Sequence, residues 1–456
     1  MAGQTQARFL TGSTMRHVAV MTLTGMIGLT FLFVADAATI FWVSFLDDER
    51  FMAALGFAWT VQFFTLSTSI GFMIAGTAMV SKSLGQGNRA NAREQATTAL
   101  MIGIGIQTIT AILIVYYRRE LLAFAGAKGD VLEIASQFLM IVVPSLLFII
   151  TGMIASSVLR AEGDARRAML VTLLVGVLTM IIDPFLILWM GLGVNGAAWG
   201  IVISRFASAC LGLYFVIKTH DLLAPPSVLL IKRWGIPFFI IAIPALMTQL
   251  SSPFGNYLIT RILSEYGESA IAGWAVLGRI IVLTFGGIFS LSGAIGGIIG
   301  QNYGAGNFDR IRMAYRDALL FSLGYVLVAW ALIAAATGPI ISLFSLSEEA
   351  ASVVKAFTYV SAGGFVFAGA LYVSNASFNN LGRPIYSTMF NWLKDGVLMW
   401  PLCIVMGGYF AAPGVVYGQG IAWAIAGIAA TIVGWRFISN VEASDKAKAG
   451  QSARLR

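Results

Sequence analysis

Residues 159–204 of this chain read LRAEGDARRAMLVTLLVGVLTMIIDPFLILWMGLGVNGAAWGIVIS. The apolar run in the middle is long enough to cross a bilayer, yet it contains Asp183 and Pro184. An ionised carboxylate at the centre of a bilayer costs at least about 2.5 kcal/mol, so such residues normally face a cavity or a partner. The stretch therefore predicts a membrane helix that carries a functional acid.

The composition of the whole chain agrees with a membrane protein. Of its 456 residues, 58% are hydrophobic and only 11% are charged, whereas soluble domains carry about 25% charged residues. We predict an all-α integral membrane protein with twelve transmembrane helices in two pseudo-symmetric six-helix lobes. The expected spans are 18–44, 52–80, 93–117, 134–158, 168–190, 195–217, 236–262, 269–299, 313–340, 352–378, 386–409 and 415–437.

The basic residues indicate the orientation. They concentrate in the loops on the side that carries both termini, while acidic residues mark the other side. Because cytoplasmic loops carry the excess of Lys and Arg, we expect both termini in the cytoplasm and a multi-pass protein of a prokaryotic inner (plasma) membrane. The net charge of +8 follows from this topology, so we expect no nucleic-acid partner.

The chain divides into four expected parts. They are an N-terminal lobe (1–219), a cytoplasmic amphipathic linker (220–234), a C-terminal lobe (235–440) and a disordered cytoplasmic tail (441–456). The linker prediction rests on a Pro-Pro pair followed by the sequence VLLIKRW, which fits a helix on the membrane surface.

The two lobes share sequence landmarks at a nearly constant offset. Gly85 and Gly163 recur 219 residues later, and the sequence Gly-Ala-Ala-Trp at 196–199 recurs as Gly-Ile-Ala-Trp at 420–423. An even number of helices returns the chain to the same side, so these are parallel repeats. Such repeats are typical of transporters that work by alternating access.

Two acids lie at similar depth in the first lobe. Asp36 and Asp183 each fall ~6–8 Å beyond the midpoint of a helix that enters from the cytoplasm, at ~1.5 Å per residue. Their counterparts in the second lobe fall near residues 253–256 and near Leu402, where there is no acid. Burial and a second nearby carboxylate both favour the protonated form, so the pair could serve as a proton site, or as a sodium site.

A structural role is the alternative for these acids. Each could cap a polar network or pair with an intramembrane cation, for which Arg205 is available. Pro184 removes a backbone donor and can bend the helix beside Asp183, which fits a site that changes shape with occupancy. Two acids at one depth in one lobe favour ion coupling.

Other intramembrane polar residues are weaker candidates. Lys394 and Asp395 are adjacent, so they should point to different faces of a helix and need not pair. They could line a central cavity or lock the C-terminal lobe, and the same alternatives hold for Arg279, which replaces Gln62 of the first repeat. The candidate cavity-lining residues are Arg205, Gln62, Asn256, Arg279, Lys394 and Asp395.

These residues carry a family resemblance. The chain resembles multidrug and toxic compound extrusion (MATE) transporters over nearly its whole length. The resemblance rests on the ordered patterns Val34–Asp36, Ser83–Asn88 (SLGQGN), Leu159–Asp164 (LRAEGD), Ile182–Pro184, Gly193–Ala198 (GVNGAA) and Gly300–Ala305 (GQNYGA). It implies export of organic, often cationic, compounds in exchange for H⁺ or Na⁺, with Asp36 and Asp183 in ion coupling.

Two polar partners of the family's coupling site do not carry over. The usual Asn is Thr179 here, which could still supply an oxygen, and an expected Thr is Ile201, which cannot. Because sodium needs several oxygen ligands, the loss of one favours H⁺ as the coupling ion, with Na⁺ as the alternative. The acid pair that one branch of the family has in the C-terminal lobe is also not evident.

Two other functions are the alternatives. A lipid-linked saccharide flippase of the same superfamily should have more cavity Arg and Lys. A membrane-embedded enzyme should have a convergent nucleophile, base or metal set, and no His or Cys grouping of that kind lies in a span. We therefore predict a transporter without cofactor or metal site, acting on small organic molecules within the lipid bilayer as a monomer.

Overall fold

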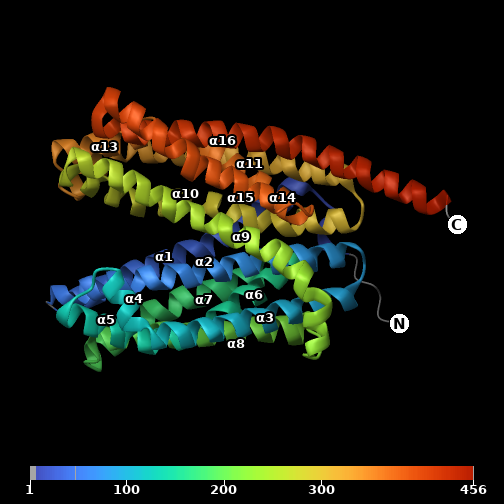
Figure 1. Cartoon of the computed structure of the whole chain (residues 1–456), viewed down its shortest axis with the longest axis horizontal. Coiled ribbons are helices and arrows are strands. Elements are labelled where there is room, and N and C mark those ends of the chain that lie inside the picture. The colour runs from blue at the N-terminus through green and yellow to red at the C-terminus, as the bar shows by residue number, and fades with distance from the viewer. Residues whose placement is uncertain (1–6, 47, 455–456) are drawn as a thin grey trace. The chain divides into compact units, whose positions relative to one another are not determined.

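A computed structural model gives the fold, and it describes residues 7–46 and 48–454. The contacts divide the chain into two compact units. The N-unit consists of Ile27–Leu84 and Asn88–Leu246, and the C-unit consists of Met1–Met26, Gly85–Gly87 and Met247–Arg456. In the described part of both units the regular structure is entirely helical (Figure 1).

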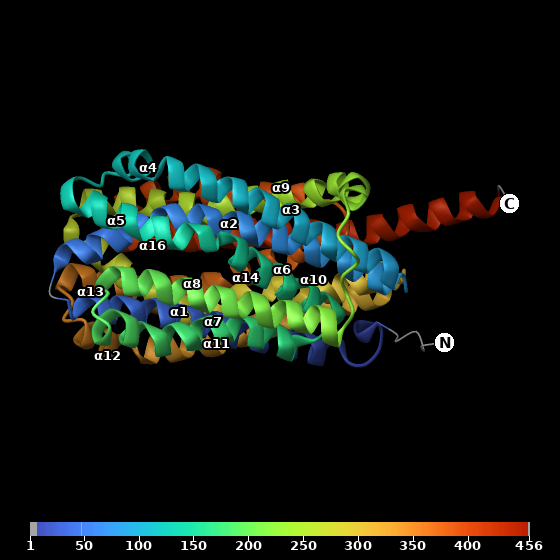
Figure 2. The same ribbon diagram turned by 90° about the horizontal axis from the view of Figure 1, so that it is seen from below.

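The first half of the chain forms eight α-helices with short 3₁₀ and π segments between them. They are α1 (Thr14–Ser44), α2 (Glu49–Gly85), α3 (Arg89–Tyr116), α4 (Arg118–Phe124), α5 (Gly129–Val142), α6 (Leu146–Glu162), α7 (Ala165–Pro184) and α8 (Gly193–Tyr214). Two π-helices, Phe185–Trp189 and Phe215–Thr219, follow α7 and α8. Within the N-unit, α7 and α8 lie along one another (Figure 2), and α6 packs on α3 and α8.

The second half forms another eight. They are α9 (Val228–Leu263), α10 (Glu268–Gly304), α11 (Phe308–Ala335), α12 (Thr337–Leu343), α13 (Glu348–Tyr359), α14 (Phe365–Asn380), α15 (Ile385–Trp392) and α16 (Met399–Arg454). A π-helix, Leu393–Leu398, joins α15 to α16. Within the C-unit, α14 packs between α10 and α16.

The helices account for the twelve expected spans. Ten helical segments of the described chain are long and apolar enough to cross a membrane, and the bent pair Glu348–Tyr359 and Ser361–Asn380 adds an eleventh. The segment Ile385–Ala447 has 63 residues and contains a non-helical residue, Ala411, with φ 54°. The chain reverses direction at Ala411, because Gly418 packs closely on the backbone of Leu402 and Cys403, where an added Cβ would clash. This segment therefore holds two spans.

The internal repeat is visible in the structure. α2 and α10 each have 37 residues, α3 and α11 each have 28, and the short helices α4 and α12 each have 7. Gly163 and Gly382 occupy equivalent turns with φ of 94° and 90°, which a residue without a side chain adopts readily. The two pseudo-symmetric six-helix lobes predicted from the sequence are confirmed.

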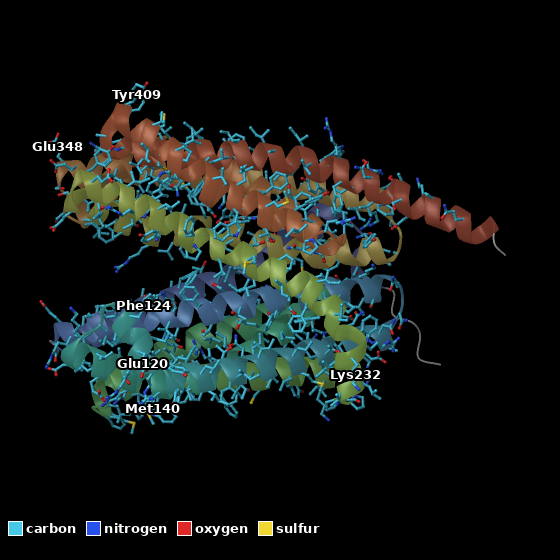
Figure 3. The ribbon with its side chains drawn as sticks, viewed as in Figure 1. Glu120, Phe124, Met140, Lys232, Glu348 and Tyr409 are labelled. Atoms are coloured by element: carbon cyan, nitrogen blue, oxygen red, sulfur yellow. The ribbon has the colours of Figure 1, made fainter. Side chains whose placement is uncertain are left out.

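The surface suits a lipid environment. Large apolar side chains are exposed along the helices, with Phe124 at 95% and Tyr409 at 79% exposure, and Tyr409 projects outward in Figure 3. Charged residues such as Lys232 and Glu348 lie at the ends of the helices. The chain is thus a multi-pass membrane protein, in which apolar surface faces hydrocarbon and polar surface lies at the ends.

Two segments differ from the sequence predictions. Residues 228–234, predicted as a separate linker helix, are the first two turns of α9, which continues to Leu263. Residues 441–454, predicted as a disordered tail, continue α16, whose end extends past the other helices of the C-unit (Figure 1). The tail contains the good helix formers Ala, Lys and Glu, and Glu442 pairs with Lys446 one turn later at 2.6 Å.

Asp164 organises the turn between α6 and α7 in the N-unit. It is the N-cap of α7, where its Oδ1 accepts from the backbone N–H of Arg167 at 3.1 Å. Its Oδ2 lies 2.5 Å from Arg167 Nη1 and 2.9 Å from His220 Nε2. Burial by itself raises the pKa of this carboxyl, but the hydrogen bonds from His220 and Arg167 hold it well below its ordinary value of 3.8.

We expect Asp164→Ala to lower the stability of the protein by ~0.5–2 kcal/mol at neutral pH, because an N-cap is lost. Since the folded state lowers the pKa of Asp164, its contribution is present above the ordinary carboxyl pKa and is lost as the pH falls below it. The apparent melting temperatures of wild type and variant should therefore converge between pH 5 and strongly acidic conditions. Asn88→Ala removes the uncharged N-cap of α3 and should show no such convergence.

Candidate functional site

Asp183 lies at the C-terminal end of α7 and is fully buried. The next residue, Pro184, has no backbone N–H, and the helix continues as the π-helix Phe185–Trp189. In this wider turn, the N–H of Met190 bonds to the carbonyl of Phe185 at 2.9 Å. π-Helical turns inside α-helices are often found at functional sites. The sequence Asp-Pro therefore positions a carboxylate where the helix geometry changes.

The two oxygens of Asp183 have different surroundings. The hydroxyl of Thr39, on α1, donates a hydrogen bond to Oδ2. Oδ1 is buried and has no hydrogen-bond partner among the described residues. Burying a charged oxygen without a hydrogen-bond partner costs a large desolvation free energy. A protonated carboxyl group carries no charge, so its burial costs much less.

Helix α8 closes the space beside Oδ1. A Cβ added at Gly200 would lie 2.2 Å from Asp183 Oδ1, so a larger residue at this position would displace the carboxylate or α8. One turn earlier, Gly196 allows α8 to approach the backbone of Leu186, and a Cβ there would come within 2.7 Å of it. The two glycines let α8 pack directly on the carboxylate and on the π-helix that follows.

Thr179 does not contact Asp183 through any hydrogen bond in the described structure. Its hydroxyl bonds to the carbonyl of Val175 at 2.9 Å and to Ser204 Oγ, on α8, at 3.0 Å. Ile201, also on α8, is partly buried and has no polar side-chain atom. The oxygen that Thr179 could offer to an ion is thus held within a hydroxyl pair.

Asp36 is partly buried on α1, one turn before Thr39. It interacts electrostatically with the cation Arg205 and with the second acid, Asp183. The described residues give it no hydrogen bond or ion pair. The structure therefore brings the two predicted acids into one electrostatic environment within the N-unit, with Asp36 the more accessible of the two.

Arg205 contacts neutral groups. Its guanidinium donates to Gln62 Oε1, on α2, at 3.0 Å and to Ser145 Oγ at 3.0 Å. No carboxylate lies within ion-pair distance of it in the described part of the chain. Gln62 and Arg205, both sequence candidates, are thus joined, and Arg205 does not neutralise Asp36 or Asp183 by direct contact.

Lys394 and Asp395, which were expected to point to different faces of a helix and so had no need to pair, form an ion pair in the C-unit. Lys394 Nζ lies 3.0 Å from Asp395 Oδ1, and both residues are 3% exposed. They belong to the π-helix Leu393–Leu398, whose wider turn reduces the angle between neighbouring side chains. The long Lys side chain can then fold over the adjacent carboxylate.

The remaining candidates lie at exposed positions. Asn256, on α9, accepts a hydrogen bond at Oδ1 from the indole N–H of Trp274, on α10, at 3.1 Å. Arg279, on α10, is exposed and makes no hydrogen bond or ion pair with the described residues.

The sequence did not identify Thr39 and Gly200, which lie against Asp183, or Ser145, which accepts a hydrogen bond from Arg205. Thr39 has a signal, because it lies one turn after Asp36 on the same face of an apolar helix. Ser145 and Gly200 have none, since small residues are common in membrane helices and their partners lie on other helices.

Comparison with known proteins gives consistent matches. The sequence model of the family described as MatE matches residues 25–185 and 244–405. The chain is 25% identical over 424 residues to the multidrug export protein MepA of Staphylococcus aureus, covering 90% of each chain. It is 24% identical over 432 residues to an FAD transporter of Shewanella oneidensis, covering 93% of this chain and 95% of the relative.

The fold also matches solved structures. One is described as the outward-facing conformation of a multidrug resistance MATE family transporter of the MOP superfamily. It aligns with a TM-score of 0.89 at 22% identity, covering 96% of this chain and 99% of the other.

Proposed function

This chain belongs to the MatE family, and from that premise we propose that it exports organic, cationic and amphipathic compounds in exchange for protons. The exchange site would be the carboxylate pair Asp36 and Asp183 of the N-unit. The relative MepA is described as a multidrug export protein, and this supports an organic substrate for the present chain. The two acids supply the negative charge that a cationic substrate needs.

The observation that carries the proposal is the environment of Asp183. Its Oδ1 is buried without a partner and faces Gly200 at close range. A proton needs no space beyond the carboxyl group, whereas a sodium ion needs several oxygen ligands around it. Thr39 already donates to Oδ2, and Thr179 is paired with Ser204, so few oxygens remain for a metal ion. This supports H⁺ over Na⁺.

The exchange would follow from competition for negative charge. With both carboxylates ionised, the pair repels itself and attracts either a proton or a cationic substrate. Protonation of Asp183 would remove the charge and favour release of the substrate. Because Asp36 is the more exposed acid and interacts with Asp183, it would relay the change between the buried group and the accessible side of the site.

The membrane orientation is part of the proposal. The excess of Lys and Arg on the side of the termini supports a cytoplasmic location for both ends of the chain in the inner membrane. Export would then run from the cytoplasmic side, whose loops are rich in Lys and Arg, to the opposite side, whose loops carry acidic residues. We propose that the protein acts as a monomer, since each chain contains both lobes.

The direct test uses purified protein in liposomes with a fluorescent cationic dye. We expect dye movement when a pH gradient is imposed with the membrane potential clamped, and no movement under a sodium gradient at equal pH. Asp36→Asn and Asp183→Asn should both abolish the response to pH. Transport driven only by sodium would contradict proton coupling, and absence of dye movement under both gradients would contradict the export of cations.

A further inference from the structure

A hydroxyl–carboxylate pair joins corresponding helices of the repeat in each unit. In the N-unit, Thr39 on α1 donates to Asp183 Oδ2, and in the C-unit, Ser251 on α9 donates to Asp395 Oδ2 at 2.9 Å. The two partners are 144 residues apart in both pairs. Each pair thus joins the first membrane helix of a lobe to the fifth.

The second pair lies at a different height from the one that the sequence offset predicts. Asp183 comes twenty residues after the turn glycine Gly163, whereas Asp395 comes thirteen residues after the equivalent Gly382. Ser251 and Asp395 are both displaced in the same direction from the positions that the 219-residue offset gives for Thr39 and Asp183. The displacement is about 10 Å along the helices at ~1.5 Å per residue. Asp395 is therefore a displaced counterpart of Asp183, and the sequence did not show this correspondence because the constant offset points to Leu402.

The two carboxylates differ in how their charge is met. Asp183 has one oxygen without a partner, and no Lys or Arg of the described chain lies within ion-pair distance of it. Asp395 has both oxygens satisfied, one by Ser251 and the other by Lys394 Nζ at 3.0 Å. Gly255 packs against the carboxylate, where an added Cβ would lie 3.0 Å from Asp395 Cβ.

Few groups surround this ion pair. Tyr372, on α14, interacts electrostatically with both members. The ring centroid of Trp423, on α16, lies 5.8 Å from Lys394 Nζ, a distance at which a cation is attracted to the ring. From α9 the facing group is Ser251, which is uncharged. Among the described residues, Lys394 is therefore the cation that neutralises Asp395.

We propose that Lys394 is a tethered internal cation that takes, at the C-unit carboxylate, the place that the exchangeable proton takes at Asp183. The inference rests on the proposed function. A covalently attached ammonium is always present and does not leave with each cycle. Removing it would leave a buried carboxylate unpaired, which is strongly unfavourable unless the carboxylate binds a proton. Lys394 thus limits exchange to the N-unit and fixes the number of protons per cycle.

The test is whether removal of the amine converts Asp395 into a proton site. In detergent-solubilised protein near neutral pH, Lys394→Met should add an infrared C=O stretching band of a protonated carboxyl group that wild type lacks. The band should be absent from the matched double variant Lys394→Met/Asp395→Asn and from Lys394→Arg, which keeps the charge. Lys394→Gln, which retains a donor, provides the same measurement if the methionine variant does not fold.

The same variants should differ in transport stoichiometry. With the membrane potential clamped, each additional exchanged proton multiplies the limiting substrate gradient by about ten per pH unit. The limiting substrate gradient of Lys394→Met should be about ten times that of wild type per pH unit. The double variant should return to the wild-type gradient. No added band in Lys394→Met or Lys394→Gln would overturn the proposal. The infrared measurement does not depend on transport and tests the role of Lys394. Transport by the wild type tests the proposed function, so failure of one can be told from failure of the other.

Discussion

Asp183→Asn is expected to make substrate binding independent of pH. Asparagine has the shape of the protonated acid and can still accept from Thr39, so the variant should fold and resemble the proton-loaded state. In wild type, a coupling free energy of about 1–3 kcal/mol between proton and substrate would change substrate affinity by roughly 5- to 150-fold between acidic and alkaline pH. The variant should lose this change and should show the weak affinity at every pH.

The measurement is equilibrium binding of a fluorescent cationic dye across a pH series. Asp317→Asn is a suitable control, because Asp317 is also a buried carboxylate that accepts from a hydroxyl, that of Thr14 in the C-unit, and it pairs with Arg316 at 3.3 Å. That control should keep the pH dependence of wild type. If Asp183→Asn bound the dye with an unaltered pH profile, Asp183 would not be the coupling acid.

Gly200→Ala should disable the same site by steric conflict. The added Cβ would lie 2.2 Å from Asp183 Oδ1, so either the carboxylate or α8 must move. Overpacking of this kind costs ~1–3 kcal/mol, which exceeds the gain of up to about 1 kcal/mol that alanine brings to a helix. We expect a lower apparent melting temperature together with loss of pH-driven transport.

A double-mutant cycle identifies the cause. Once Asp183→Ala has removed the carboxylate, Gly200→Ala should no longer destabilise the protein, because the conflicting atoms are gone. Equal destabilisation in both backgrounds would mean that α8 packs against something other than the acid. Gly105→Ala is the matched control, since a Cβ at that position on α3 meets no atom within 4 Å.

The sequence predicted the fold well because its signals are local. Apolar runs, turn glycines and the 219-residue offset each involve a short stretch or a simple repeat, and the helices follow them closely. The two segments that differ, 228–234 and 441–454, both became extensions of neighbouring helices. Composition indicated a boundary there, but helix continuity depends on propensity and on pairs such as Glu442 with Lys446.

The candidate site was only partly predictable. A carboxylate in an apolar helix is conspicuous, so Asp36 and Asp183 could be found from the sequence alone. Their partners could not, because Thr39 and Gly200 are defined by contacts between helices. The pairing of Lys394 with Asp395 was not predicted, since adjacent residues point to different faces of an α-helix and the segment is a π-helix.

The two compact units do not coincide with the two halves of the sequence. The C-unit includes the residues that precede and begin α1: Phe9 is buried there, its N–H bonds to Gln301 Oε1 at 2.8 Å, and Arg310 donates to its carbonyl at 2.9 Å. The N-unit likewise includes residues 220–246 of the second half, where Arg93 donates to the carbonyl of Leu223 at 3.0 Å. In a chimaera that joins the N-terminal lobe of one family member to the C-terminal lobe of another, each unit would receive its adjoining N-terminal or linker segment from the other protein. The lobes are therefore not interchangeable modules.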